Sequence, residues 1–117
     1  MLYVWIDRFF SETPGPRHRD SGSFSAEELY DKLLAEYGEC FDGNEKILLD
    51  FSNTAGVAAS FLDELVGKLV LLMGGESVTR CIKWNFGCDY IGEEVPRYIE
   101  EWEELRLDGV TSTRFQS

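Results

Sequence analysis

The stretch from Lys46 to Gly75, KILLDFSNTAGVAASFLDELVGKLVLLMGG, decides the fold. It opens with a short, continuous apolar run over residues 47–49, which is typical of a central strand buried on both faces. A loop of small residues follows over 53–59. From Ser60 the apolar residues recur at helical spacing, which predicts a helix that ends near Met73, before two glycines. The stretch therefore predicts a strand, a loop and a helix in direct succession.

Ser60 stands where the loop meets the helix, and two roles are open for it. As the N-cap, its hydroxyl would accept a hydrogen bond from the backbone N–H of residue 62 or 63, and Asp63 could bond back in an S-x-x-D capping box. As a phosphorylation site, it would place a phosphate beside the free N–H groups and the positive dipole end of the helix. The residue types alone favour the capping role.

Elements on either side of this stretch continue the alternation of strand and helix. Ser25 and Glu28 form a capping box, which predicts the start of a helix that Gly38 would end. Pro96 suits the first turn of a last helix. The expected elements are a strand over residues 2–10, a helix over 25–38, a turn over 42–44, a strand over 79–86 near a sheet edge, and a helix that begins near residue 95.

This order predicts a single domain with an α/β layer fold. Strands that alternate with helices form a mostly parallel or mixed sheet with right-handed crossovers. For 117 residues we expect about 3–5 strands and about three helices. The domain would span residues 1–107, and residues 108–117 would form a loose C-terminal tail. Gly67, inside the central helix, leaves room for the close approach of a neighbouring element.

Two strand-to-helix loops could carry a functional site, the loop over residues 10–24 and the loop over 52–59. If their parent strands are parallel, both loops lie at the carboxyl edge of the sheet, where ligands of open α/β sheets bind. The first loop carries Arg17, His18 and Arg19 in an otherwise acidic protein. It could bind a small anion. Alternatively, Pro14 and Pro16 fix the conformation of the loop, and Arg17 bonds local carboxylates or carbonyls. The composition of the loop favours this second interpretation.

The chain contains no complete catalytic or metal-binding motif. No G-x-S-x-G surrounds Ser60, as a nucleophile elbow would require, and the first loop lacks the G-x-x-x-x-G-K-[ST] pattern of a P-loop. Cys40, Cys81 and Cys88 show no zinc-ligand spacing, and their odd number argues against a disulfide framework. We therefore expect free thiols, no cofactor and no enzymatic activity.

The formal net charge of -11 argues against nucleic acid and against an anionic membrane surface as partners. The acid is concentrated over residues 92–108, where seven carboxylates accompany only Arg97 and Arg106. This run favours a solvated helix face over a site for a basic partner. The chain shows no signal-peptide pattern, and its longest apolar run is too short to cross a bilayer, so the expected location is the cytoplasm.

Two blocks of the sequence, FSETPGPRHRDSGSFSAEEL and ILLDFSNTAGVAASFLDELVGKL, resemble the STAS-like domains of unknown function found in bacteria. They carry a strand ending in F-S, a T-P-G-x-R loop, a G-x-F-S-x-E helix start and a G-x-x-x-S-F-L-D-E helix start. The resemblance spans Leu2 to Val70. The matching residues include Thr13, Gly15, Arg17 and Glu27 in the first block, and Asp50, Gly56, Ser60, Asp63, Glu64 and Gly67 in the second.

The resemblance implies a STAS-like fold, which is a small α/β sandwich with helices beside a mixed sheet, and a regulatory function. STAS domains proper include the anti-sigma factor antagonists, in which a serine or threonine at the start of the helix after the central strand is the switch. A partner serine kinase of the histidine-kinase ATPase type phosphorylates that residue and thereby changes binding. Ser60 is the counterpart in this chain. The antagonists typically show D-S-[ST]-G there, whereas this chain reads Ala58-Ala59-Ser60-Phe61.

The favoured hypothesis is a non-enzymatic regulatory module that binds a protein partner, with Ser60 as its candidate phosphosite and a histidine-kinase-like ATPase among the candidate partners. The alternative is a small-anion- or nucleotide-binding protein or enzyme that uses the Arg17–Arg19 loop beside Ser60. A third hypothesis is a scaffold subunit that associates through Leu71. The candidate site residues around Ser60 are Thr13, Gly15, Arg17, Arg19, Gly56, Asp63 and Glu64.

Overall fold

The structure of the chain, a computed structural model, describes residues 1–42 and 45–116, and the side chains of residue 42 and of residues 110–116 lie outside the description. The turn expected over residues 42–44 falls at the gap, so it lies outside the described residues. The elements follow in the order β1 (Leu2–Trp5), α1 (Ile6–Phe9), η1 (Arg19–Ser21), α2 (Ala26–Asp42), β2 (Ile47–Asp50), α3 (Ala59–Met73), α4 (Gly75–Cys81), β3 (Ile82–Asn85), η2 (Tyr90–Glu94) and α5 (Val95–Gln116).

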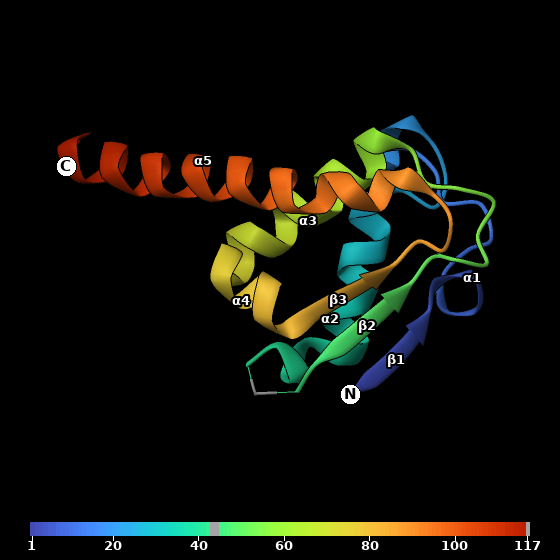
Figure 1. The fold of residues 1–117 in the computed structure, drawn as a ribbon. Helices are drawn as coiled ribbons and strands as arrows, with labels where there is room; N and C mark the ends of the chain where they lie inside the picture. The colour runs from blue at the N-terminus through green and yellow to red at the C-terminus, as the bar shows by residue number, and fades with distance from the viewer. Residues whose placement is uncertain (43–44, 117) are drawn as a thin grey trace.

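The three strands form one parallel sheet in the order β1-β2-β3, with β2 in the centre (Figure 1). α2 connects β1 to β2, and α3 with α4 connects β2 to β3. The α/β fold, the parallel sheet and the edge position of β3 are therefore confirmed. The described residues contain five α-helices rather than about three, because α1 and α4 are short helices that the sequence predicted as parts of strands.

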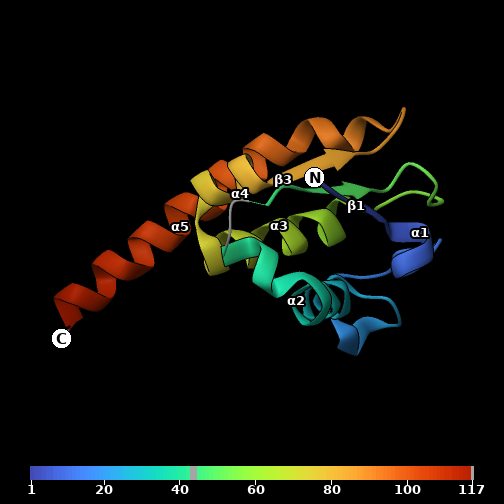
Figure 2. The same ribbon diagram turned by 90° about the horizontal axis from the view of Figure 1, so that it is seen from below.

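The core lies between the sheet and the helices α2 and α3, which lie together on one side of the strands (Figure 2). Each strand alternates in sidedness, so every second side chain faces these helices. Four strand residues of this face are at most 2% exposed, and the helix residues that meet them are fully buried. They are Val4, Ile47, Leu49 and Ile82 on the strands, Leu29 and Leu33 on α2, and Leu62, Leu65, Val66 and Leu69 on α3.

The opposite face of the sheet is open at β1. Tyr3 pairs in register with Leu48, and Trp5 pairs with Asp50, so these four side chains share that face. Tyr3 is 44% exposed and Trp5 is 42% exposed, and their ring centroids lie 4.5 Å apart. The helices thus cover the sheet on one side, and the other side presents an aromatic pair to solvent.

The first strand is shorter than the strand expected over residues 2–10. The backbone turns into α1 at Ile6, and the N–H groups of Phe10 and Ser11 both donate to the Ile6 carbonyl at 2.9 Å. Ile6 is fully buried. A single helical turn buries Ile6 in the core as well as a longer strand would. The alternation of apolar residues in the sequence therefore did not distinguish a helical turn from a strand at this position.

α2 begins as predicted and ends later than predicted. The Glu28 N–H donates to Ser25 Oγ at 3.2 Å, which is one half of the predicted capping box. The helix then passes through Gly38 to Asp42, so the prediction that Gly38 ends it is wrong. Cys40 and Phe41 pack on the core, and burial of this extra turn outweighs the weak helix propensity of the glycine.

Two glycines separate α3 from α4. Gly74 ends α3 in the left-handed region at φ 84°, and its N–H bonds the Val70 carbonyl at 2.8 Å. The chain then forms α4, so β3 begins at Ile82 and not at residue 79 as predicted. Val78 and Cys81 are the buried residues at helical spacing, a pattern too short for the sequence to reveal a helix.

α5 crosses α3, and its C-terminal half extends beyond the rest of the molecule (Figure 1). At the crossing the Trp102 ring packs directly on Gly67, where a side chain would collide with the ring. The expectation that Gly67 admits a neighbouring element is therefore confirmed. The helix continues to Gln116, through residues for which the sequence predicted a tail without regular structure.

Candidate functional site

The loops that follow β1 and β2 meet at the carboxyl edge of the sheet, as their parallel parent strands predict. The Ala55 N–H in the second loop donates to the Glu12 carbonyl in the first loop at 2.7 Å. The Phe51 N–H donates to the Asn85 carbonyl at 2.7 Å, so the end of β3 joins the same edge. This edge therefore assembles three segments that are far apart in the sequence.

Arg17 reaches from the first loop to the first turns of α3. Its Nη1 lies 3.1 Å from Asp63 Oδ2 and 3.5 Å from Glu64 Oε2, and all three side chains are partly buried. Two adjacent helix residues thus converge on one guanidinium, which the roughly 100° between neighbouring side chains on a helix did not suggest. Arg17 is committed to carboxylates of its own chain.

The other two residues of the Arg17–Arg19 segment, His18 and Arg19, contact other carboxylates. His18 Nδ1 lies 3.2 Å from Glu27 Oε1 and 3.9 Å from Glu64 Oε1. Arg19 forms an ion pair with Asp31 on α2, and its backbone N–H donates to Glu27 at 2.9 Å. That bond from Arg19 lowers the pKa of the Glu27 carboxyl. Arg17, His18 and Arg19 are therefore all within reach of carboxylates of the chain, and Arg19 lies away from α3.

Asp63 joins the first loop to α5. Its Oδ2 accepts from Arg17 at 3.1 Å, and its Oδ1 accepts from Trp102 Nε1 at 2.9 Å. The predicted S-x-x-D capping box with Ser60 is therefore absent, because both oxygens of the carboxylate serve other donors. The Asp63 side chain, predicted to cap the start of its own helix, instead connects α3 to the first loop and to α5.

Ser60 is the second residue of α3 and not its N-cap. The helix begins at Ala59, and the N-cap is Ala58, which supplies no side-chain bond. The prediction of a capping serine is therefore wrong by two positions. Ser60 is exposed, and within the described residues no hydrogen bond of its hydroxyl is formed. Its backbone lies in the first turn, where the N–H groups of a helix lack intrahelical partners.

The remaining predicted site residues shape the two loops. Thr13 N–H donates to Ser11 Oγ at 3.0 Å, and Gly15 N–H donates to the Phe24 carbonyl at 2.8 Å, which closes the first loop. A side chain at Gly15 would collide with the carbonyl of Ser23. Gly56 lies in the second loop at φ 133°, with open space around it. These residues hold the backbone of the loops.

A second polar cluster at this edge surrounds Asp50, the last residue of β2. Asp50 is only 3% exposed. Its Oδ1 accepts from the Ser52 N–H at 2.8 Å and from the Ser52 hydroxyl at 2.5 Å. Its Oδ2 accepts from the Tyr3 hydroxyl and from Asn85 Nδ2, the latter at 3.3 Å. All three strands thus bond to one carboxylate.

The titration of this cluster follows from those bonds. Burial raises the pKa of the Asp50 carboxyl, but the bonds from Ser52, Tyr3 and Asn85 together outweigh burial and hold that pKa below its usual value. The bond to Asp50 raises the pKa of the Tyr3 hydroxyl, since ionised Tyr3 would lose the bond and face a negative charge. Asp50 is therefore ionised and Tyr3 neutral near neutral pH.

The sequence analysis did not propose this cluster as a site. A signal was present, because an aspartate that ends a continuous apolar strand must find donors or remain at the surface. The donors could not be named, because Tyr3 and Asn85 come from the two neighbouring strands, and their registers with Asp50 are properties of the folded sheet. Every oxygen of this carboxylate is satisfied, so the cluster serves to tie the strand ends together.

The family model for the STAS-like domain of unknown function (DUF4325) matches residues 25–84. The chain belongs to this family. The matched part of the STAS-like domain runs from the start of α2 to Trp84 in β3, and so includes Asp50, Ser60 and Asp63. It extends beyond Val70, where the resemblance in the sequence ended, and leaves β1, the first loop and α5 outside. No curated protein and no solved structure gives a significant match to the chain.

Three further properties of the STAS-like domain bear on its chemistry. Cys40, Cys81 and Cys88 are free thiols, as expected. Among the described residues, histidine, cysteine and carboxylate side chains form no group of three or more that could hold a metal ion. No helix in the described part of the chain combines the length and hydropathy that a membrane crossing requires.

Proposed function

We propose that this STAS-like domain is a non-enzymatic regulatory module of bacterial signalling that binds a protein partner at the carboxyl edge of its sheet, with Ser60 as the phosphorylation site. One observation carries the proposal. The three hydroxyls of the segment after β2 differ in availability: Ser52 donates to Asp50 at 2.5 Å and Thr54 donates to the Phe51 carbonyl at 2.7 Å, whereas the exposed Ser60 hydroxyl forms no hydrogen bond within the described residues. Ser60 is thus the hydroxyl that a kinase could reach without breaking an internal bond.

A phosphate on Ser60 would meet two opposing influences. The first-turn N–H groups and the helix dipole favour a negative charge there. Asp63 and Glu64, one turn further along α3, would repel it, but both are held by Arg17. A phosphate would compete with them for Arg17, because phosphate oxygens form strong charge-assisted bonds with guanidinium. Phosphorylation would therefore rearrange the ion pairs beneath the first loop and change the surface that a partner contacts.

The alternative, a small-anion or nucleotide site or an enzyme built on the Arg17–Arg19 loop, receives less support. Arg17, His18 and Arg19 each already contact a carboxylate of the chain, so an incoming anion would have to displace that carboxylate. His18, the only histidine, lies with Glu27 and Glu64, so it is not positioned as a base for Ser60. The free thiols accord with the cytoplasmic location that we include in the proposal.

The test uses the intact chain and the histidine-kinase-like ATPases of the organism that encodes it. Each ATPase is incubated with the chain and ATP, and intact mass and peptide mapping report phosphorylation. Isothermal calorimetry measures binding before and after modification. We expect modification at Ser60, none in Ser60→Ala, and an altered affinity for the ATPase. Modification confined to Ser52 or Thr54 would contradict the assignment of Ser60, and the absence of both binding and modification with every ATPase would refute the proposal.

A further inference from the structure

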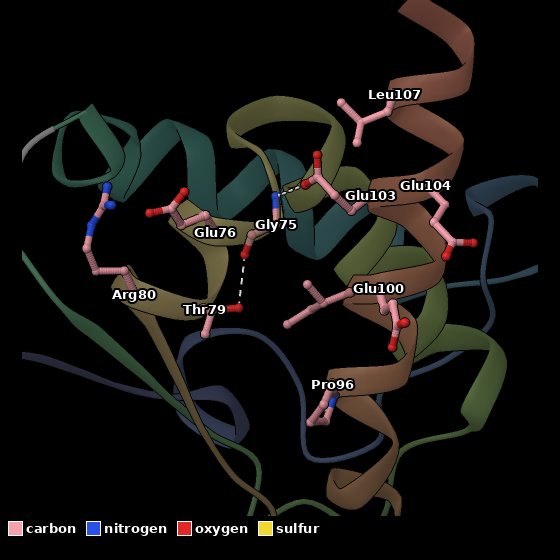
Figure 3. Close-up of a pocket in the computed structure, with 10 residues that line it drawn as sticks. Gly75, Glu76, Thr79, Arg80, Pro96, Glu100, Glu103, Glu104 and Leu107 are labelled. Carbon is pink, nitrogen blue, oxygen red and sulfur yellow. Dashed lines mark hydrogen bonds between the residues drawn. The ribbon is translucent and has the colours of Figure 1, made fainter.

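A groove between α4 and α5 is an apolar surface feature that the proposed function does not use. It has a volume of about 500 Å³ and joins a smaller cavity of about 230 Å³ beneath β3, with Thr79, Pro96 and Ile99 lining both. The groove forms because Gly75 starts α4 directly against α5, where a side chain would press on Ile99 at 3.2 Å. The Gly75 N–H also donates to Glu103, which fastens the two helices at one end of the groove (Figure 3).

The floor of the groove is apolar, its α5 rim is acidic, and its α4 rim carries Glu76 together with the basic Arg80. Pro96, Ile99 and Leu107 of α5 line it, and Leu107 is 52% exposed. Figure 3 shows Glu76 of α4 on one side and Glu100 and Glu104 of α5 on the other, with their carboxylates directed outward. All three are exposed, and none of them forms an ion pair with a residue of the described part.

The pairing of charges along α5 explains why these carboxylates remain available. Arg97 is occupied by Glu94 and Glu101. Arg106 is occupied by Glu103, whose pKa is lowered by the bonds from Arg106 and from the Gly75 N–H. Glu94, Glu101 and Glu103 are thus paired with arginines of α5, whereas Glu100 and Glu104 on the α5 rim of the groove are not. The solvated helix face expected from the sequence is one wall of a two-sided groove.

We propose that this groove binds a basic amphipathic helix of the protein partner. The proposal deepens the proposed function, since it rests on the existence of such a partner and states its chemistry. An apolar stripe on that helix would cover Ile99, Pro96 and Leu107, and lysine or arginine flanking the stripe would meet Glu76 on one side and Glu100 and Glu104 on the other.

The shape of the groove favours a helix over an extended segment. Its lining on α5 follows the spacing i, i+3, i+4, i+7, i+8 and i+11 from Pro96 to Leu107, which corresponds to about three helical turns or roughly 17 Å. The backbone groups of α4 and α5 bond within their own helices, so along this part an extended segment would find few main-chain partners. A helix satisfies its own backbone and needs only side-chain contacts. A second copy of the chain is disfavoured by its own net charge of -11.

The direct test measures binding of a fluorescein-labelled peptide of about 15 residues, with leucine on one helical face and lysine on the other, to the full chain. Fluorescence anisotropy gives the affinity at two salt concentrations, and amide chemical shifts locate the site. We expect shifts confined to residues 75–80 and 96–107, and weaker binding at higher salt. A scrambled peptide of the same composition should bind at least about tenfold more weakly, because it presents no continuous apolar stripe.

Two triple variants with equal changes in net charge separate this site from general attraction to an acidic protein. Removing the rim charges with Glu76→Gln, Glu100→Gln and Glu104→Gln should weaken peptide binding about tenfold. The matched control removes three exposed carboxylates elsewhere, with Asp20→Asn, Glu36→Gln and Glu39→Gln, and should change the affinity less than about threefold. Circular dichroism checks that both variants fold; since all six positions are exposed, neither should lose structure.

The same variants distinguish failure of this inference from failure of the proposed function. No peptide binding, equal losses in both triple variants, or shifts outside the groove would overturn the inference, as would a dimer in light scattering that only the rim variant disrupts. A protein partner that binds the rim variant with unchanged affinity would also overturn it, while leaving the regulatory module intact. Conversely, specific peptide binding in the groove together with no ATPase binding and no Ser60 modification would support the groove and refute the proposed function.

Discussion

Gly67 is where α5 is attached to the STAS-like domain, and replacing it with alanine tests that attachment. An ideal Cβ at this position would lie 2.6 Å from Cδ2 and 2.7 Å from Cζ2 of Trp102. Carbon atoms pack best at about 3.5–4.0 Å, so the ring must move by about 1 Å. Such overpacking costs about 1–3 kcal/mol.

The displaced ring also loses its hydrogen bond. Trp102 Nε1 donates to Asp63 at 2.9 Å, and a bond to a charged acceptor contributes about 1.5–3 kcal/mol. Alanine regains about 0.5–1 kcal/mol because it favours the helix more than glycine does. We therefore expect Gly67→Ala to lower the free energy of unfolding by about 2–4 kcal/mol, or Tm by on the order of 10 °C.

Gly38→Ala is the matched control. Gly38 also lies inside a helix, α2, but nothing lies within 4 Å of its ideal Cβ. The same substitution should therefore raise stability there by about 0.5–1 kcal/mol. Urea unfolding followed by tryptophan fluorescence and by circular dichroism measures both variants and checks that the transitions coincide. A Gly67→Ala variant within about 0.5 kcal/mol of the parent, or stabilised like the control, would show that α5 is not seated on Gly67 as described.

Four further predictions concern single side chains. Asp50→Asn should lower stability at pH 7 by about 2–4 kcal/mol. The folded pKa of Asp50 is lowered, so the stability that its carboxylate contributes is present above the unfolded pKa and is lost as pH falls through the folded pKa. Unfolding measured from pH 6 to pH 2 should therefore show the difference in stability between parent and variant shrink in acid. Ala58→Ser should add the missing N-cap bond to α3 and raise stability by about 0.5–2 kcal/mol. Ser60→Ala should change stability by less than about 0.5 kcal/mol. Equal effects of the two substitutions in thermal unfolding would contradict the helix start at Ala59. Glu103→Gln should raise amide exchange at the start of α4, and unchanged exchange at Gly75 would contradict the described fastening of the groove. Because the folded pKa of Glu103 is lowered, the difference in stability between parent and variant should shrink as pH falls through that folded pKa.

The central stretch was predictable because one physical requirement dominates there. Ile47 and Leu49 are at most 1% exposed, and the buried residues from Phe61 to Val70 recur at helical spacing, so pattern and structure agree there. Leu48 is only partly buried, because it lies on the other face of the sheet. The positions of β2, α3 and the loop between them followed directly. The parallel order and the meeting of the two loops at one edge followed from the alternation of strands and helices.

The errors arose where several structures satisfy the same local pattern. Ile6 is buried in a helical turn as well as it would be in a strand, and Gly38 is tolerated inside α2 because the next turn adds buried surface. Ser60 has a residue type that fits an N-cap, but Ala58 holds that position, and the potential capping partner Asp63 is taken by Arg17 and Trp102. Those tertiary partners lie 46 and 39 residues from Asp63, beyond the reach of any local pattern.

Asp63 also has a thermodynamic consequence for the whole domain. One carboxylate holds the first loop through Arg17 and the last helix through Trp102, although both of these residues lie outside the family-matched part of the chain. Two segments that do not bond each other are therefore energetically coupled, and removing Arg17 and Trp102 together should cost a different amount from the sum of the two single losses. A group that draws Arg17 away, such as a phosphate on Ser60, would change the free energy with which α5 is held, and α5 is one wall of the groove. By reciprocity, occupancy of the groove would alter how readily the first loop releases Arg17.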